Sequence, residues 1–139
     1  MSLRIRGYEP ADYDAVWALH VSALRAVGAH AGRGPWDDDL AAIESVYLKD
    51  HGEFLVGALR GRVVAMGAVK RISAEHVEFK RMRVEPSLQG QGIGRAMLGA
   101  LEQRARELGY RTLHLDTHYT ASSSAAPVRE KQLPGGRSW

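Results

Sequence analysis

The segment Gln89–Gly94 contains the residues of this chain that are best suited to bind a negatively charged group. It reads Gln-Gly-Gln-Gly-Ile-Gly, with glycine at positions 90, 92 and 94. Glycine permits tight turns and leaves backbone N–H groups accessible to an anion, and a helix that begins here adds its positive N-terminal end. We interpret the segment as a cradle for a pyrophosphate, because an ordinary loop and helix cap would not need so many glycines.

A second group of polar residues, His114, Asp116 and His118, alternates in the way that places all three on one face of a strand. Two imidazoles and a carboxylate on one face resemble a metal-binding triad. Alternating polar residues on a half-exposed strand explain the same pattern equally well. We favour this simpler explanation and expect no metal site.

Length and composition indicate one soluble globular domain. The 139 residues are 45% hydrophobic and 25% charged, and they include no cysteine, which excludes disulfides and a cysteine nucleophile. No apolar run approaches the ~20 residues of a membrane helix and no signal-peptide pattern is present, so we expect a cytoplasmic protein. The net charge of +3 comes from scattered Lys and Arg. It suits an acidic small molecule, and nucleic acid is an unlikely partner.

Hydrophobic periodicity predicts the order strand, two helices, three strands, long helix and strand. A short turn at Arg60-Gly61 should join two of the strands, and Gly109 is the expected C-terminal cap of the long helix. The expected elements are a strand at 3–8, helices from residue 9 and from residue 35, strands at 53–59, 62–72 and 76–84, a helix at 92–108 and a strand at 112–116.

A dinucleotide-binding βαβ unit is another setting for a glycine-rich turn. Such a unit needs the spacing G-x-G-x-x-G after an early parallel strand, with an acidic residue about 20 residues later. Residues 89–94 lack this spacing and lie two-thirds along the chain, behind strands that we expect to be antiparallel. The position of this segment in the chain argues against a dinucleotide-binding unit more strongly than its glycine spacing does.

The longer run Phe79–Leu98 resembles the acetyl-CoA motif of the GNAT superfamily of N-acetyltransferases. The family signature, Q/R-x-x-G-x-G/A, is met by Gln89, Gly92 and Gly94. The predicted order of elements is also similar to that fold, and the resemblance covers roughly residues 3–117. It implies an α/β protein with the GNAT-like acyl-CoA N-acyltransferase fold, a mixed central sheet flanked by helices, and acetyl-CoA as cosubstrate.

The resemblance also implies which residues contact the cosubstrate. In the family, the strand before the motif pairs through its main chain with the pantetheine arm, a role that falls here to Met82 and Val84. The Met82 N–H would also stabilise the thioester oxyanion, and Arg95 would add a charge-assisted contact. The pyrophosphate would be held by N–H groups of Gln89, Gly90, Gln91, Gly92, Ile93, Gly94 and Arg95.

Acetyl transfer to an amine also needs a proton acceptor, because an amine with a pKa near 10 is mostly protonated at neutral pH. Glu78 is our candidate general base, since it lies on the strand before the motif, where many family members carry a catalytic glutamate. The competing interpretation, to which we give equal weight, is a strand carboxylate paired with Lys80, Arg81 or a cross-strand cation. His76 and then Glu75 are weaker candidates.

The acceptor is expected to be a small-molecule or peptide amine, and no residue identifies it. The resemblance places acceptor-binding residues between the first two helices, where the sequence has Trp36 and Asp37–Asp39. An acidic rim would attract a cationic amine, but aspartates also favour a helix N-terminus. We prefer the second explanation.

The chain departs from the family pattern after Thr117. The family continues with another helix, a Leu-Tyr pair, a Gly-Phe-Arg-Glu segment and a last pair of strands, and residues 118–139 contain none of these. We expect a GNAT-like domain at 1–117 and an atypical, poorly ordered tail at 118–139, with the C-terminal helix and last strands missing or altered. An exposed sheet edge would then allow a homodimer.

Three functions remain open from the sequence. The first is an N-acetyltransferase that moves an acetyl group from acetyl-CoA to a primary amine. The second is a CoA-binding module with little or no catalytic activity, consistent with the altered tail. The third is a nucleic-acid-binding domain, which salt-sensitive oligonucleotide binding would reveal.

We hypothesise that a one-base shift of reading frame near Thr117 explains the tail. Back-translation of residues 121–139 with synonymous codons, read one base later, permits a peptide that contains Leu-Tyr and then Phe-Arg-Glu, in the order of the family. Sequencing the gene tests this hypothesis. Codons that do not yield that peptide in the shifted frame would refute it.

Overall fold

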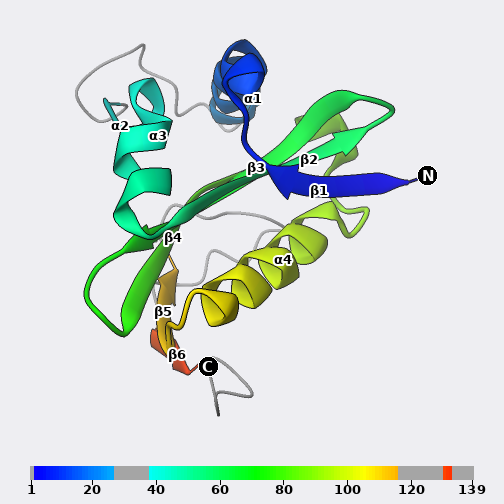
Figure 1. The fold of residues 1–139 in the computed structure, drawn as a ribbon. Helices are drawn as coiled ribbons and strands as arrows, with labels where there is room; N and C mark the ends of the chain where they lie inside the picture. The colour runs from blue at the N-terminus through cyan, green and yellow to red at the C-terminus, as the bar shows by residue number, and fades with distance from the viewer. Residues whose placement is uncertain (1, 27–37, 116–129, 133–139) are drawn as a thin grey trace.

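The chain folds into a mixed sheet with helices on both faces, seen in the computed structural model of Figure 1. Residues 2–26, 38–115 and 130–132 are described. The strands are β1 (Leu3–Gly7), β2 (Glu53–Leu59), β3 (Arg62–Arg71), β4 (His76–Val84), β5 (Thr112–Leu115) and β6 (Glu130–Gln132), and the helices are η1 (Pro10–Asp12), α1 (Tyr13–Ala26), α2 (Asp38–Ala41), α3 (Ile43–Val46), η3 (Leu48–Asp50), η4 (Pro86–Leu88) and α4 (Ile93–Glu107).

The six strands lie in the sheet in chain order, from β1 at one edge to β6 at the other. Neighbouring strands are antiparallel except β4 and β5, which run parallel because α4 connects them across one face. The predicted α/β class and mixed sheet are therefore confirmed. Within the tail, the described residues 130–132 form β6 beside β5.

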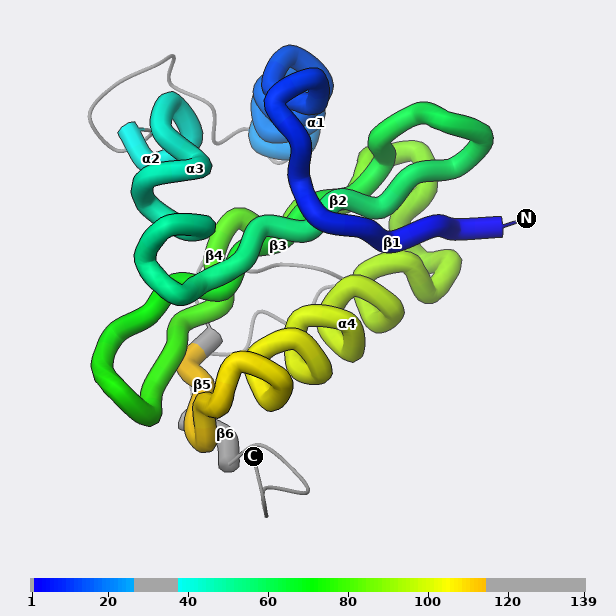
Figure 2. The backbone as a smooth tube through the Cα atoms, in the orientation of Figure 1, coloured from blue at the N-terminus to red at the C-terminus, as the bar shows by residue number. Residues whose placement is uncertain are grey.

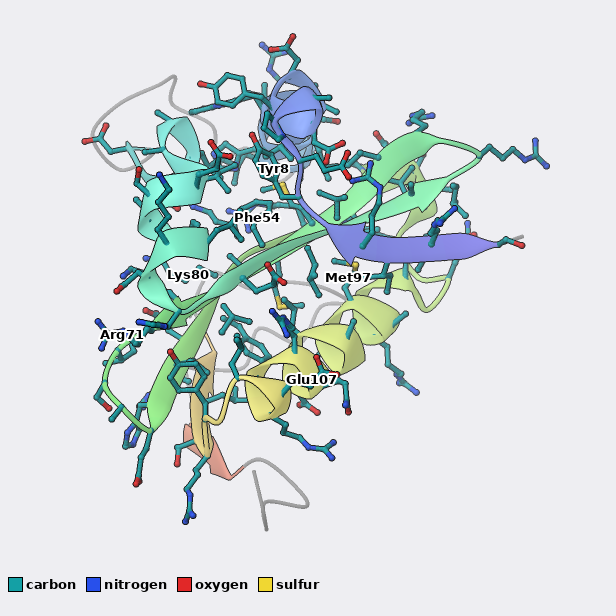
Figure 3. The ribbon with its side chains drawn as sticks, in the orientation of Figure 1. Tyr8, Phe54, Arg71, Lys80, Met97 and Glu107 are labelled. Atoms are coloured by element: carbon teal, nitrogen blue, oxygen red, sulfur yellow. The ribbon has the colours of Figure 1, made fainter. Side chains whose placement is uncertain are left out.

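Helices cover the two faces of the sheet unequally. Figure 2 shows α1, α2 and α3 on one face and α4 alone on the other. Figure 3 shows Tyr8 and Phe54 on the face toward α1 and α3, and Met97 between α4 and the sheet. Each face has its own buried cluster: Val77, Phe79, Met82, Val84, Met97, Leu101 and Leu113 belong to the α4 face, and Val16, Leu40, Ile43, Tyr47, Phe54, Val56 and Met66 to the opposite face.

Several predicted boundaries are confirmed. The strands at 53–59 and 76–84 match β2 and β4, and the long helix differs from α4 by one residue at each end. Arg60 and Gly61 form a two-residue turn with φ values of 53° and 80°, the left-handed pair that suits a tight hairpin. Gly109 adopts a φ of 97° directly after the last turn of α4, as a C-terminal cap requires.

The predicted second helix is wrong in detail, because the chain forms three short segments, α2, α3 and η3. The backbone leaves the helical region at Ala42 (φ −138°, ψ 49°). The hydroxyl of Tyr47 donates a hydrogen bond to Asp39, eight residues earlier. A continuous helix would separate these residues by about 12 Å along its axis, so the break allows the two side chains to meet.

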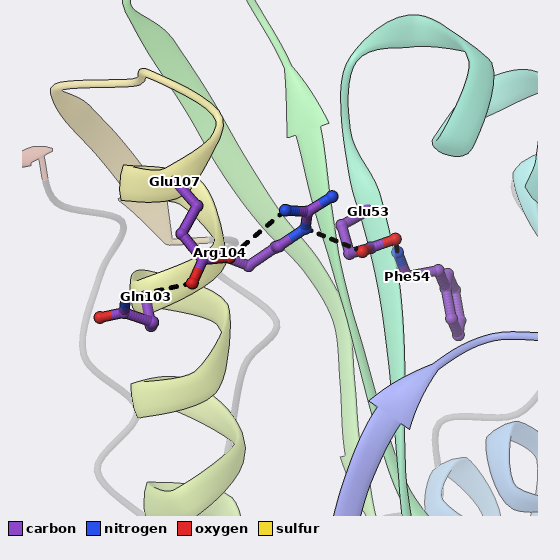
Figure 4. A network of polar contacts seen from close by, with 5 residues as sticks. All are labelled: Glu53, Phe54, Gln103, Arg104 and Glu107. Atoms are coloured by element: carbon purple, nitrogen blue, oxygen red, sulfur yellow. Dashed lines mark hydrogen bonds and ion pairs between the residues drawn. The ribbon is translucent and has the colours of Figure 1, made fainter. Parts of the chain in front are cut away.

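The C-terminal half of α4 is anchored to the beginning of β2. Arg104 Nε lies 2.9 Å from Glu53 Oε2, and Arg104 Nη1 lies 3.3 Å from Glu107 Oε1, which forms the network of Figure 4. Beyond the helix, the Tyr110 hydroxyl donates to the backbone carbonyl of His51 at 2.8 Å. These contacts join α4 to the turn that leads from η3 into β2.

Candidate functional site

A β-bulge interrupts the pairing of β3 with β4. The register shifts between Met66 and Ala68 of β3, so that Gly67 faces two residues of β4, Arg81 and Met82. Arg81 adopts the left-handed conformation, with a φ of 59°. This conformation costs a non-glycine residue about 1–2 kcal/mol, so other interactions must hold it.

The bulge decides which backbone groups of β4 face away from β3. At the end of β4, the Glu85 N–H donates to the carbonyl of Val64 at 2.8 Å. Because hydrogen-bonding groups alternate in direction along a strand, Arg83 also faces β3, whereas the N–H groups of Met82 and Val84 point away from it.

The extra residue also sets the side-chain faces of β4. Val77 and Phe79, upstream of the bulge, and Met82 and Val84, downstream of it, all belong to the buried cluster under α4. Side chains alternate between faces in a regular strand, so without Arg81 as an extra residue the second pair would lie on the opposite face. The bulge therefore keeps one continuous apolar surface under α4.

In the described part of the chain, no strand pairs with the outward edge of β4 beside Met82 and Val84. Among the described residues, β5 pairs only with His76–Phe79 of β4, so this part of the edge has no neighbouring strand. The two outward carbonyls accept side-chain hydrogen bonds: Met82 O from Arg83 Nη1 at 3.0 Å, and Val84 O from Gln89 Nε2 at 3.3 Å. An extended ligand can add to such an edge through main-chain hydrogen bonds.

The glycine-rich loop continues directly from this edge. Gly90 and Gly92 have φ values of 84° and 87°, and a Cβ at either position would meet no atom within 4 Å, so these glycines serve backbone conformation and leave open space. The hydrogen bond from Ala96 N to Gly92 O, 3.0 Å long, is the first of α4. The N–H groups of Ile93–Arg95 precede it and have no partner within the helix. The glycine-rich loop and the N-terminal end of α4 therefore offer N–H donors that suit the binding of an anion.

Glu78 lies upstream of the bulge on the face opposite α4, by alternation with Val77 and Phe79. Its register neighbours are Lys70 on β3 and His114 on β5. Lys70 Nζ instead lies 3.2 Å from Asp50, and no ion pair or hydrogen bond is found for the Glu78 carboxylate among the described residues.

The other candidate bases lie toward the start of β4. The ring of His76 is 5.7 Å from that of His114, and its Nδ1 lies 3.2 Å from Ser73 Oγ. The backbone carbonyl of Glu75 accepts hydrogen bonds from Arg111 and Thr112, so it fixes the beginning of β5.

Asp39 makes a contact that the sequence interpretation missed. It lies in the first turn of α2, as expected for an aspartate at a helix N-terminus, and it also binds Arg81 through two contacts, Nε to Oδ2 at 2.8 Å and Nη2 to Oδ1 at 2.5 Å. The side chains are only 13% (Arg81) and 17% (Asp39) exposed. The acidic run was the only signal in the sequence, and it does not reveal a partner 42 residues away.

The same cluster shifts the ionisation of its members. Burial by itself would raise the pKa of Asp39, but hydrogen bonds from Arg81 and Tyr47 outweigh it and lower the pKa below that of an ordinary aspartate. Burial, followed by the charge of Asp39, raises the pKa of the Tyr47 phenol. Tyr47 therefore remains a hydrogen-bond donor, and Asp39 an anion, at neutral pH.

Other features do not join this site. A cavity of about 460 Å³ lies between η1 and the α2–α3 segment, and none of the predicted site residues lines it. In the described part of the chain, no group of three His, Asp or Glu side chains could hold a metal ion, and no helix is long and apolar enough to cross a membrane. Trp36, Asp37, Asp116 and His118 lie outside the described residues.

Comparison with known proteins gives consistent similarities. The model of the Acetyltransferase (GNAT) family matches residues 14–131. A mycothiol acetyltransferase of Sanguibacter keddieii is 30% identical over 94% of this chain and 42% of its own length, and an IAA acetyltransferase of Azospirillum brasilense is 38% identical over 56% and 52%. The chain thus spans about half the length of these curated relatives.

A solved structure resembles the fold along nearly the whole chain. The PaiA N-acetyltransferase of Thermoplasma acidophilum, in complex with coenzyme A, superposes with a TM-score of 0.75 over 95% of this chain and 99% of that one, at 15% identity. At this identity the likeness concerns the fold.

Asp39 should make the stability of the protein depend on pH. Because its pKa is lower in the folded than in the unfolded chain, its contribution is complete above the ordinary aspartate pKa and is lost as the pH falls through the lowered value. Asp39→Asn should lower the free energy of unfolding at pH 7 by about 2 kcal/mol and flatten its decline below pH 5. Urea unfolding from pH 7 to 3 measures both. An equally steep decline in parent and variant would contradict the assignment.

Proposed function

Because the chain belongs to the GNAT acetyltransferase family, we propose that it transfers the acetyl group of acetyl-CoA to a primary amine. The observation that supports this most strongly is the succession of two features along the chain. The first is the edge of β4 at Met82 and Val84, which no strand among the described residues covers, and the second is the glycine loop that follows η4. Together they provide main-chain N–H donors, on β4 for the extended pantetheine arm and in the loop for the pyrophosphate.

Each part of acetyl-CoA has residues suited to it in these two features. The outward N–H groups of Met82 and Val84 would pair with the pantetheine amides, and the N–H groups of Gln89–Arg95 would bind the pyrophosphate. Arg95 is exposed in the first turn of α4, where its guanidinium would add a charge-assisted hydrogen bond.

The reaction needs a neutral amine and a polarised thioester. The amine nitrogen forms a bond to the acetyl carbon, the C–S bond breaks, and the thiolate leaves with the electron pair. The proton lost by the amine passes to Glu78, whose carboxylate has no cation bound to it among the described residues. The Met82 N–H would stabilise the negative charge that develops on the thioester oxygen.

The alternative function, a CoA-binding module with little or no catalytic activity, has one observation in its favour. In the described part of the tail, the only element is β6, which has three residues. The cosubstrate residues all precede the tail, so CoA binding would survive even if the altered segment removes part of the acceptor site.

Calorimetric titration of acetyl-CoA into the full chain tests the cosubstrate site. The parent should bind acetyl-CoA and Gly92→Glu should not. A carboxylate at the loop repels the pyrophosphate, and the φ of 87° at position 92 favours glycine over glutamate. Gly99→Glu is the matched control: it adds the same charge at an exposed position of α4 and should leave binding intact. Failure of a folded parent to bind acetyl-CoA would refute the proposal.

Substitution of Glu78 tests the proton acceptor, with an amine found by screening for acetyl-CoA-dependent acetylation. Glu78→Gln should lower kcat by about 100-fold at pH 7 without changing KM for acetyl-CoA. Activity should recover as the pH approaches ~10, where the amine loses its proton unaided. His76→Gln, on the same strand, serves as control and should retain activity. Unchanged kcat in Glu78→Gln would exclude it as the base, and binding without transfer to any amine would favour the alternative function.

A further inference from the structure

The bulge of β4 interrupts the regular pairing with β3, and it determines which N–H groups reach the proposed thioester. Its extra residue, Arg81, has a left-handed backbone, which favours glycine in other proteins. The sequence has no glycine here, so the conformation needs support from the side chain itself.

That support comes from the α2–α3 segment. Arg81 binds the Asp39 carboxylate through both its Nε and an Nη, the two-point geometry that fixes the orientation of a guanidinium. Tyr47, only 1% exposed, donates its hydroxyl to the same carboxylate. The Tyr47 ring packs edge-on against Phe54 of β2, with centroids 5.6 Å apart.

We propose that Arg81, Asp39 and Tyr47 are positioning residues that hold the bulge so that the Met82 N–H points at the acetyl carbonyl of bound acetyl-CoA. This inference rests on the proposed function and adds a role for two residues of the helical segment, Asp39 and Tyr47, which act on β4 through Arg81. Loss of the ion pair removes this support from the left-handed backbone of Arg81, so the Met82 N–H no longer keeps one fixed direction. The pyrophosphate loop lies beyond the bulge and retains its own hydrogen bonds, so CoA still binds, with an affinity reduced only by the weakened main-chain contacts of β4 to the pantetheine arm.

Infrared difference spectroscopy of acetyl-CoA labelled with ¹³C at the acetyl carbonyl reads this hydrogen bond directly and needs no turnover. With the parent protein, the carbonyl stretch should shift to lower frequency on binding, because the N–H polarises the carbonyl. With Asp39→Asn and with Arg81→Ala, the shift should be lost at concentrations where calorimetry shows that acetyl-CoA is bound. Arg81→Gly is the matched rescue variant: it removes the same ion pair, but glycine tolerates the left-handed backbone, so it should keep more of the shift than Arg81→Ala.

Asp50→Asn is the matched control. Asp50 binds Lys70 and Arg71 at 3.2 and 2.9 Å, so it forms another ion pair between the same helical region and the sheet, at the C-terminal end of β3 and outside the bulge. It should keep the full carbonyl shift. Tyr47→Phe removes one hydrogen bond and should reduce the shift partially, which provides a milder variant if Asp39→Asn does not fold.

The outcomes separate the two proposals. A parent-like carbonyl shift in folded Asp39→Asn and Arg81→Ala overturns the positioning role and leaves the proposed function standing. An equal loss of shift in Asp50→Asn also overturns it, because general loosening of the helical segment would then suffice. Absence of acetyl-CoA binding by the folded parent refutes the proposed function, and the inference with it.

Discussion

The left-handed backbone of Arg81, fixed by Asp39, is the constraint on which the candidate site depends. It inserts one residue into β4, and this insertion selects both the apolar face under α4 and the direction of the Met82 and Val84 N–H groups. Replacement of a buried ion pair by apolar residues is often neutral or stabilising, so the pair is weak as a source of net stability. Its value here lies in selecting one register among those that β3 and β4 could adopt.

The two faces of the sheet have different roles, and β4 contributes to both. The α4 face carries a continuous apolar cluster. Gly67 allows α4 to pack closely against β3, since a Cβ at this position would lie 2.7 Å from Leu101 Cδ1. The opposite face places polar groups, Glu78 among them, toward α1 and the α2–α3 segment. The bulge at Arg81 allows β4 to contribute apolar side chains to the α4 face both before and after it, while Glu78 lies on the opposite face.

The sequence predicted the parts of the fold that repeat regularly or carry turn residues. β4 and α4 follow from period-two and period-3.6 patterns, and the Arg60–Gly61 turn and the glycine loop follow from residues that favour positive φ. The bulge could not be predicted, because arginine has no preference for the left-handed backbone that Arg81 adopts. The role of Asp39 was equally hidden, since its partner lies 42 residues away and a helix cap explains an aspartate without one.

The anchoring of α4 at one end has a consequence for its motions. Arg104 and Tyr110 bind the helix and its exit to Glu53 and His51, whereas the first turn emerges from a loop of glycines and has N–H groups with no partner in the helix. Protection against amide hydrogen exchange should therefore decrease along α4 from its C-terminal to its N-terminal half. An anion at the first turn would reduce this gradient, so ligand binding would be visible as local slowing of exchange around Ile93–Arg95.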